Sequence, residues 1–197
     1  MRRIVAEAFL SLDGVTEDPG RFGEYEHRGW TVPYWNDDTV RWHNEALFAS
    51  DALLLGRVTY EEFAAIWPRR QPDEAREGLR SGDPFTDRMN SLPKFVASTT
   101  LQAPLEWNST LLEGDAADAV ADLKEQPGED ILIYGSGALV NTLMTHNLID
   151  EYRLMIYPVV LGRGKRLFGD GGTMPLALRR SETSSTGVTM LVCEPQT

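Results

Sequence analysis

Short apolar runs alternate with amphipathic segments along most of the chain. The apolar runs are bounded by Gly, Pro, Asp or Ser, which is typical of buried strands that end at turns. We therefore predict strands at residues 4–12, 51–55, 94–97, 131–134 and 151–160.

The segments between these runs carry apolar residues at helical spacing. Residues 36–38 read Asn-Asp-Asp, and acids of this kind suit the first turn of a helix. We predict helices that begin near Asn36, span 59–67, follow Asp83-Pro84, begin at Asp115 and follow Gly137. Residues 16–33 are predicted to form a long ordered loop, and 68–84 a connector.

Strands that alternate with helices favour parallel pairing through right-handed crossovers. The last two segments, 176–183 and 187–194, are expected to pair antiparallel through the turn at 184–186. The pattern predicts an α/β fold in one domain over residues 1–197, with a mostly parallel sheet and an antiparallel C-terminal edge.

Charge and composition exclude several classes of partner. The 197 residues carry a net charge of −11, which disfavours binding to nucleic acid or to an anionic membrane. No run reaches the roughly 20 apolar residues of a membrane span. The single cysteine, Cys193, rules out an internal disulfide and suits the cytoplasm, and the three histidines form no metal-ligand cluster with it.

The stretch ILIYGSGALVNTLM predicts a strand that breaks at Gly135-Ser136-Gly137 and opens a helix. Backbone N–H groups at such a turn can hold a phosphate. The third glycine of a dinucleotide fingerprint is replaced by Val140, so this is no standard Rossmann motif. A tight turn without a ligand is the alternative.

Two further strand ends carry polar groups. Gly56-Arg57 and Thr59 follow one strand, and Thr59 with Glu62 is expected to form a capping box. Hydroxyls at residues 98–100 follow another strand. Because parallel strands place their carboxyl ends along one edge, three such turns could hold the three phosphates of NADPH. The alternative is that these turns bind no ligand: Thr59 only caps its helix, Arg57 faces solvent and the hydroxyls form an ordinary polar turn.

The order of SLDGV, LLLGRVTYE, FVASTT, ILIYGSGAL and EYRLMIYPVVLGRGKRLF resembles the dihydrofolate-reductase-like superfamily. It is most similar to the reductase domain of the bifunctional riboflavin-biosynthesis deaminase/reductase. This resemblance implies a three-layer fold with a central, mainly parallel sheet of about eight strands. It also implies an NADPH-dependent reductase, similar to 5-amino-6-(5-phosphoribosylamino)uracil reductase, that acts on a small heterocyclic or carbonyl substrate, in a homodimer.

The resemblance also implies roles for particular residues in binding NADPH. Those assigned to the pyrophosphate and the nicotinamide ribose are Gly56, Arg57, Thr59, Gly135, Ser136, Gly137, Ala138 and Leu139. Those assigned to the adenosine 2′-phosphate are Ser98, Thr99 and Thr100. Those expected near the nicotinamide or in the loop that closes beside it are Asp13, Gly14, Val15, Gly162 and Gly164.

Candidate catalytic residues are fewer. Asp13 is the acid expected nearest the point of hydride transfer, and Asp37 is either a proton donor or ring anchor, or stabilises the helix dipole. His43 is expected to pack inside rather than to act as a catalyst.

Substrate-binding residues are predicted from aromatic and basic side chains. Trp30 and Trp35, with Phe22, Tyr25 and Tyr34, could stack on a flat heterocycle, or could cover a hydrophobic edge or a dimer contact. The basic pairs at 69–70 and 165–166 are candidates for a ribose phosphate. The alternative function is a non-catalytic nucleotide-binding or dimerisation module.

Overall fold

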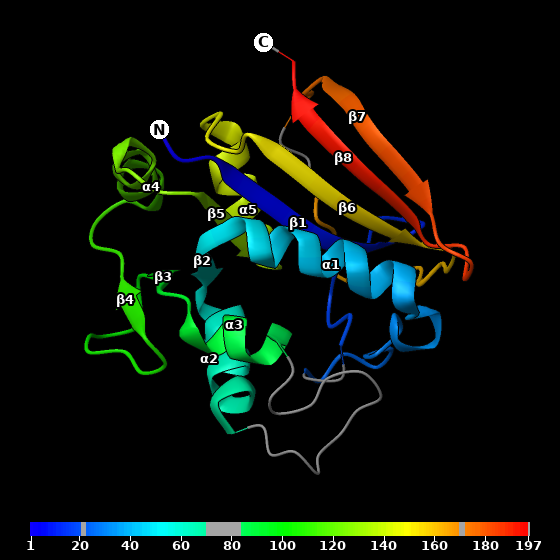
Figure 1. The fold of residues 1–197 in the computed structure, drawn as a ribbon, viewed down its shortest axis with the longest axis horizontal. Helices are drawn as coiled ribbons and strands as arrows, with labels where there is room; N and C mark the ends of the chain where they lie inside the picture. The colour runs from blue at the N-terminus through cyan, green and yellow to red at the C-terminus, as the bar shows by residue number, and fades with distance from the viewer. Residues whose placement is uncertain (21–22, 70–83, 170–171, 197) are drawn as a thin grey trace.

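An eight-stranded sheet runs through the molecule in the order β4-β3-β2-β5-β1-β6-β8-β7 (Figure 1). The computed structural model describes residues 1–20, 23–69, 84–169 and 172–196. The predicted residues Phe22, Arg70 and Asp83 lie outside these ranges. The strands are β1 (Ile4–Ser11), β2 (Ser50–Gly56), β3 (Lys94–Ala97), β4 (Ser109–Leu111), β5 (Asp130–Tyr134), β6 (Glu151–Tyr157), β7 (Leu176–Thr183) and β8 (Thr189–Pro195).

The sheet is parallel from β4 to β6 and antiparallel where β8 joins β6 and β7. The predicted α/β fold, with its antiparallel C-terminal edge, is therefore confirmed. The helices are α1 (Asp37–Ala49), α2 (Arg57–Ile66), α3 (Pro84–Ser91), α4 (Ala116–Glu125) and α5 (Gly137–Thr145), with short 3-10 helices η1 (Val32–Tyr34) and η2 (Trp67–Arg69).

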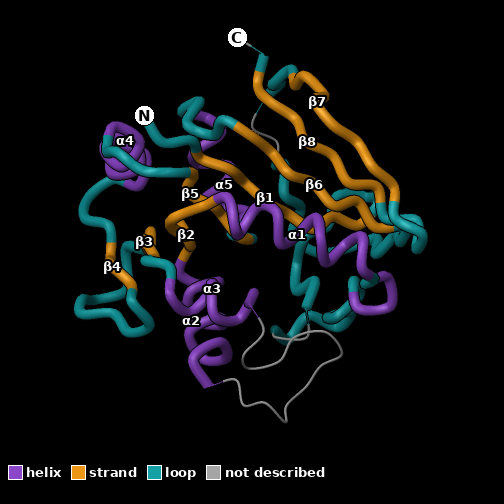
Figure 2. Tube along the Cα trace, in the orientation of Figure 1, coloured by secondary structure: helices purple, strands orange, loops and turns teal. Residues whose placement is uncertain are grey.

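Alternate residues of β1 face opposite helical layers, so that the sheet is buried on both sides. Ile4 and Ala6 pack in one apolar cluster with α4 and α5. Val5 packs in the other, with Leu47 of α1 and Met89 of α3. Figure 2 shows the strands as one twisted layer with helices in front of it and behind it.

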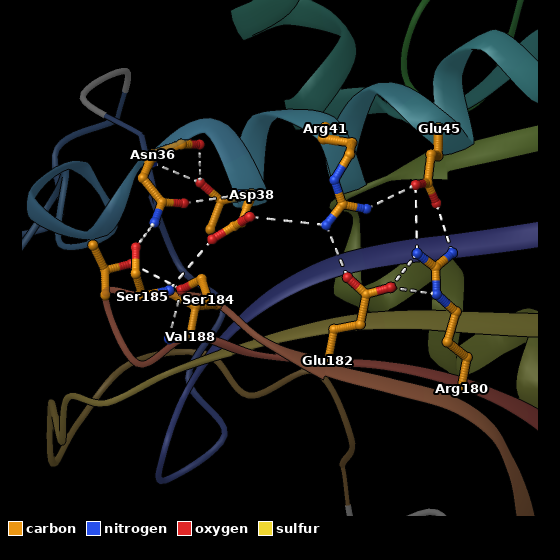
Figure 3. Close-up of polar contacts among 11 residues, drawn as sticks. Asn36, Asp38, Arg41, Glu45, Arg180, Glu182, Ser184, Ser185 and Val188 are labelled. Carbon is orange, nitrogen blue, oxygen red and sulfur yellow. Dashed lines mark hydrogen bonds and ion pairs between the residues drawn. The ribbon is translucent and has the colours of Figure 1, made fainter.

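Helix α1 also packs over the C-terminal hairpin formed by β7 and β8. Trp42 is fully buried against Met155, Met190 and Val192. Beside this apolar contact, charged side chains of α1 pair with those of β7, and Asp38 accepts a hydrogen bond from the N–H of Ser185 in the turn that follows β7 (Figure 3). The antiparallel hairpin is thereby attached to the helix as well as to the parallel strands.

Three local predictions need correction. The short strand β4 was not predicted, and β6 ends at Tyr157 because Pro158 has no N–H to continue the ladder. Helix α2 begins at Arg57, with Gly56 as its N-cap, so the expected capping box of Thr59 and Glu62 does not form. The Thr59 hydroxyl bonds to Ser136 instead.

All eight strands belong to one sheet, and the assignment of residues 1–197 to a single domain stays a prediction. Within the described ranges, every helix is too short or too polar to cross a lipid bilayer.

Candidate functional site

The three turns that carry phosphate-binding signals lie side by side. They follow β3, β2 and β5, which are consecutive and parallel in the sheet. Ala97 is the register partner of Gly56, so the 98–100 hydroxyls begin directly beside the start of α2. The predicted convergence of the three turns at one edge is therefore confirmed, while their role in binding stays a prediction.

Ser136 joins the two central turns. Its Oγ accepts a hydrogen bond of 2.8 Å from the N–H of Gly56, and its hydroxyl shares a 2.8 Å bond with that of Thr59. A Cβ on Gly56 would lie 2.9 Å from Ser136 Oγ, so this approach needs glycine. Ser136 itself has a left-handed backbone, with φ 58° and ψ 57°. Such strain in a non-glycine residue is typical of functional turns.

Two helices therefore start next to each other at this point. Neither α2 nor α5 has a capping hydrogen bond from the side chain of its own N-cap residue, which is Gly56 in α2 and Ser136 in α5. Free N–H groups and the positive end of the helix dipole attract anions. The pair of N-termini fits a diphosphate better than one terminus alone would.

The turn after β1 lies against the loop that follows β6. Asp13 accepts hydrogen bonds from the N–H groups of Leu161 (3.1 Å) and Gly162 (2.8 Å), and from the Ser11 hydroxyl (2.7 Å). These bonds, the Ser11 hydroxyl first, lower the pKa of Asp13 to about 2. A carboxyl group this acidic is a poor proton donor at neutral pH. The geometry favours an anchoring role, and the catalytic role of Asp13 stays a prediction.

Glycines let this loop come close to its neighbours. Gly14 has φ +83°, and Gly164 has φ +123° with a Cβ position 2.6 Å from Val15 Cγ1. Gly162 also has a positive φ, of +78°, with open space around it. The backbone of Arg166 lies 3.7 Å from where a Cβ on Gly137 would be, so the loop reaches the start of α5.

Arg166 is the cation best placed at this edge. Its Nε donates a 3.0 Å hydrogen bond to the carbonyl oxygen of Asp13, and it has no ion-pair partner among the described residues. Lys165 pairs with Glu17, and Arg57 pairs with Glu61 one turn along α2. Residues 165–166 were predicted as candidates for a substrate phosphate, and this role stays a prediction. The structure places the Arg166 backbone beside Gly137 and its side chain beside Gly14.

Of the remaining predicted site residues, Ala138 and Leu139 lie at the candidate site, whereas Asp37, Trp30 and Trp35 lie in or before the first turn of α1. Asp37 is exposed in the first turn of α1. Trp30 is buried in the cluster beneath α1, with its indole N–H on the Glu17 carbonyl oxygen. Trp35 lies edge-on to Phe9, with ring centroids 5.7 Å apart. Ala138 and Leu139 belong to the first turn of α5.

A buried polar cluster next to the turns was not predicted. Glu7 on β1 is the register partner of Tyr134, the residue before Gly135. Its Oε1 lies 2.7 Å from Nδ1 of His43 on α1. Among the described residues, Glu7 Oε2 and the hydroxyls of Tyr134 and Tyr157 have no hydrogen-bond partner. The sequence signal that could have found it is a glutamate inside an otherwise apolar strand.

The two tyrosines remain neutral at ordinary pH. Burial, and then the charge of Glu7, raises the pKa of both Tyr134 and Tyr157. Both hydroxyls therefore keep their protons inside the folded protein. No group of metal-ligating side chains is present in the described part of the chain.

Comparison with known proteins agrees with this architecture. Residues 2–190 match the model of the RibD C-terminal domain. The chain belongs to the RibD C-terminal domain family. Among curated relatives, it is 31% identical over 193 residues to the uncharacterized protein YyaP of Bacillus subtilis (strain 168), covering 97% of this chain and 94% of YyaP.

Solved structures share the RibD-type fold. A protein provisionally assigned to riboflavin biosynthesis in Shewanella sp. PV-4 aligns with a TM-score of 0.74 and 22% identity, over 99% of each chain. The diaminohydroxyphosphoribosylaminopyrimidine deaminase/5-amino-6-(5-phosphoribosylamino)uracil reductase of Thermotoga maritima aligns with a TM-score of 0.64 and 14% identity. That alignment covers 99% of this RibD-family chain but 57% of the Thermotoga protein.

Proposed function

We propose that this protein is an NADPH-dependent reductase of the RibD C-terminal type, acting on a small heterocyclic or carbonyl-bearing substrate. The observation that carries the proposal is the junction of two uncapped helix N-termini at Ser136, on the sheet edge shared by all the parallel strands. NADPH would supply a hydride there, and the protein would hold the cofactor and substrate in position and set the electrostatic environment of the reaction.

Different residues at this edge suit different parts of NADPH. Amides near Gly56 and Gly137, with the Thr59 hydroxyl, suit the pyrophosphate. The 98–100 hydroxyls and Arg57 suit the 2′-phosphate, which NADH lacks. The turn at 13–15 and the glycines of the 161–167 loop suit the nicotinamide end, because the loop is fastened there by Asp13.

A fluorescence titration with NADPH tests this function. We expect micromolar binding and weaker binding of NADH. Arg166→Ala should weaken NADPH binding roughly 10- to 100-fold, because a charge-assisted hydrogen bond is lost. Arg179→Ala is the matched control, because Arg179 is an exposed arginine on β7 that pairs with Glu194.

The alternative is a nucleotide-binding or dimerisation module without catalysis. It predicts binding of NADPH but no oxidation with any member of a panel of flat heterocycles and carbonyl compounds. Absence of NADPH binding by the folded protein would overturn the proposed function itself. Assembly into a homodimer stays a prediction that light scattering can test.

A further inference from the structure

The Glu7 and His43 side chains form a pair that connects the interior of the sheet with the surface. The side chain of Glu7 is 0% exposed and that of His43 is 14% exposed, with 2.7 Å between Oε1 and Nδ1. His43 is the basic group paired with Glu7, whereas Arg153, the register partner of Glu7 on β6, is paired with Glu45 and Glu151. A buried carboxylate with one unpartnered oxygen costs stability, and groups of this kind are concentrated at functional sites.

The pair fixes the orientation of the imidazole ring. Because Nδ1–H donates to Glu7, Nε2 is the nitrogen left to act, and it has no hydrogen-bond partner among the described residues. Four aromatic rings surround the imidazole, at centroid distances of 4.9–5.6 Å. They are Phe9, Trp35, Phe85 and Tyr134. This apolar wall leaves the ring little freedom to rotate away.

The position of the pair matches the proposed cofactor edge. Tyr134 is both the register partner of Glu7 and the residue that leads into Gly135. Its ring lies 5.0 Å from that of His43. The imidazole is therefore separated from the candidate nucleotide turn by one side chain.

We infer that His43, held by Glu7, donates the proton that accompanies hydride transfer in the proposed reductase. The inference rests on that proposed function. Reduction of a C=N or C=O bond needs a hydride at carbon and a proton at the heteroatom. The doubly protonated imidazole gives its Nε2 proton to that heteroatom and becomes neutral, while Glu7 keeps the Nδ1 proton in place. His43 then regains a proton through its exposed edge.

The other titratable groups that face the pair are less suited. Tyr134 on β5 and Tyr157 on β6 are almost fully buried and have raised pKa values, so they are weak acids that cannot readily regain a proton. Arg153 on β6 stays charged. Asp13 lies beyond the end of β1, where backbone amides occupy its carboxylate. His43 is thus the proton donor, and Glu7 a positioning residue.

The spectrum of the histidine ring nitrogens in the full-length protein decides the inference. Histidine labelled with 15N is observed with and without NADP⁺, and the His43 signals are assigned with His43→Gln. We expect a hydrogen-bonded Nδ1–H signal that moves in Glu7→Gln, because an amide is a weaker acceptor than a carboxylate. We also expect NADP⁺ to shift the Nε2 signal of His43 and to leave that of His146, an exposed histidine after α5, in place.

Activity gives a second readout with 5-amino-6-(5-phosphoribosylamino)uracil, the compound in the name of the Thermotoga relative. With this probe, we expect kcat to fall at least about 100-fold in His43→Gln, with KM and NADPH affinity within twofold of wild type. His146→Gln should match wild type. NADP⁺ that binds without moving the His43 signals would overturn the inference and leave the proposed function standing. Failure of NADP⁺ and NADPH to bind would overturn the proposed function.

Discussion

Lys94 carries an ammonium group into the interior of the molecule. It is fully buried at the start of β3, donates a 3.0 Å hydrogen bond to the Asn90 carbonyl oxygen and lies 4.1 Å from the centre of the Trp107 ring. Burial lowers the pKa of Lys94 from 10.5 to about 8. The folded protein therefore releases this proton at a lower pH than the unfolded chain does.

The pH dependence of stability should reveal this group. Between pH 8 and 10.5 the unfolded chain binds more protons at Lys94, so its contribution to the free energy of unfolding rises with pH over that window. Lys94→Met should remove this rise. Urea denaturation at several pH values measures it, with Lys165→Met as control because Lys165 is exposed. An unchanged slope in Lys94→Met would show that Lys94 is not the source.

Some features of the candidate site can be predicted from single residues in the sequence, and others depend on the fold. Gly135 and Gly56 stand at strand ends, where turn chemistry is visible locally, so the position of these turns along one edge of the sheet could be predicted. The pairing of Glu7 with His43 spans 36 positions along the chain and depends on the seating of α1 over β1. Nothing local in the sequence fixes that seating. His43 packs among aromatic rings as expected, but its pairing with Glu7 could not be predicted.

Helix α1 is held over the C-terminal hairpin by a network of charges (Figure 3). Glu45 accepts from Arg180 of β7 at 2.8 Å and from Arg153 of β6 at 3.3 Å, and Arg41 donates to Glu182 at 2.9 Å. The guanidinium groups of Arg153 and Arg180 also lie 4.8 Å and 4.5 Å from the Trp42 ring centre. Glu45 thus pairs with both cations that stack on a buried indole, while Glu151 and Glu182 each pair with one of them.

Neutralising that acid should loosen α1. We expect Glu45→Gln to lower the free energy of unfolding by about 1–2 kcal/mol. The largely buried Arg153 then keeps only Glu151 of its two carboxylate partners among the described residues. The hydrogen bond from Arg180 lowers the pKa of Glu45. The difference in free energy of unfolding between wild type and Glu45→Gln should therefore shrink as the pH falls below 4.5.

Chemical denaturation measures this difference. The matched control is Glu61→Gln, which removes the exposed pair with Arg57 on α2 and should cost less than about 0.5 kcal/mol. Equal losses in the two variants would show that the network adds nothing beyond an ordinary surface pair.

Elements with a strong apolar pattern could be predicted from the sequence, and weakly patterned ones could not. β2 and β5 are continuous apolar runs, and parallel strands buried on both faces have this composition. β4 has three residues, Ser109–Leu111, and exists because it adds to the edge of β3. Its formation depends on tertiary pairing that its own residues do not encode.

The molecule as a whole should become more stable when the cofactor binds. A ligand at 100 times its Kd that binds only the folded state adds about 2.7 kcal/mol to the free energy of unfolding. For a chain of this length, a melting temperature higher by several degrees follows. Thermal denaturation with NADPH measures the shift. Arg166→Ala should reduce it at the same NADPH concentration, and Arg179→Ala should not.

The place of β1 in the sheet has a consequence for biosynthesis. Strand β1 has β5 (Asp130–Tyr134) and β6 (Glu151–Tyr157) as its neighbours, and both follow it far along the chain. At ribosomal speeds of about 5–20 residues per second, its main-chain donors and acceptors wait on the order of ten seconds for both partners. A nascent chain stalled before residue 130 therefore exposes an apolar strand that lacks both of its sheet neighbours, the kind of segment that aggregates unless chaperones bind it.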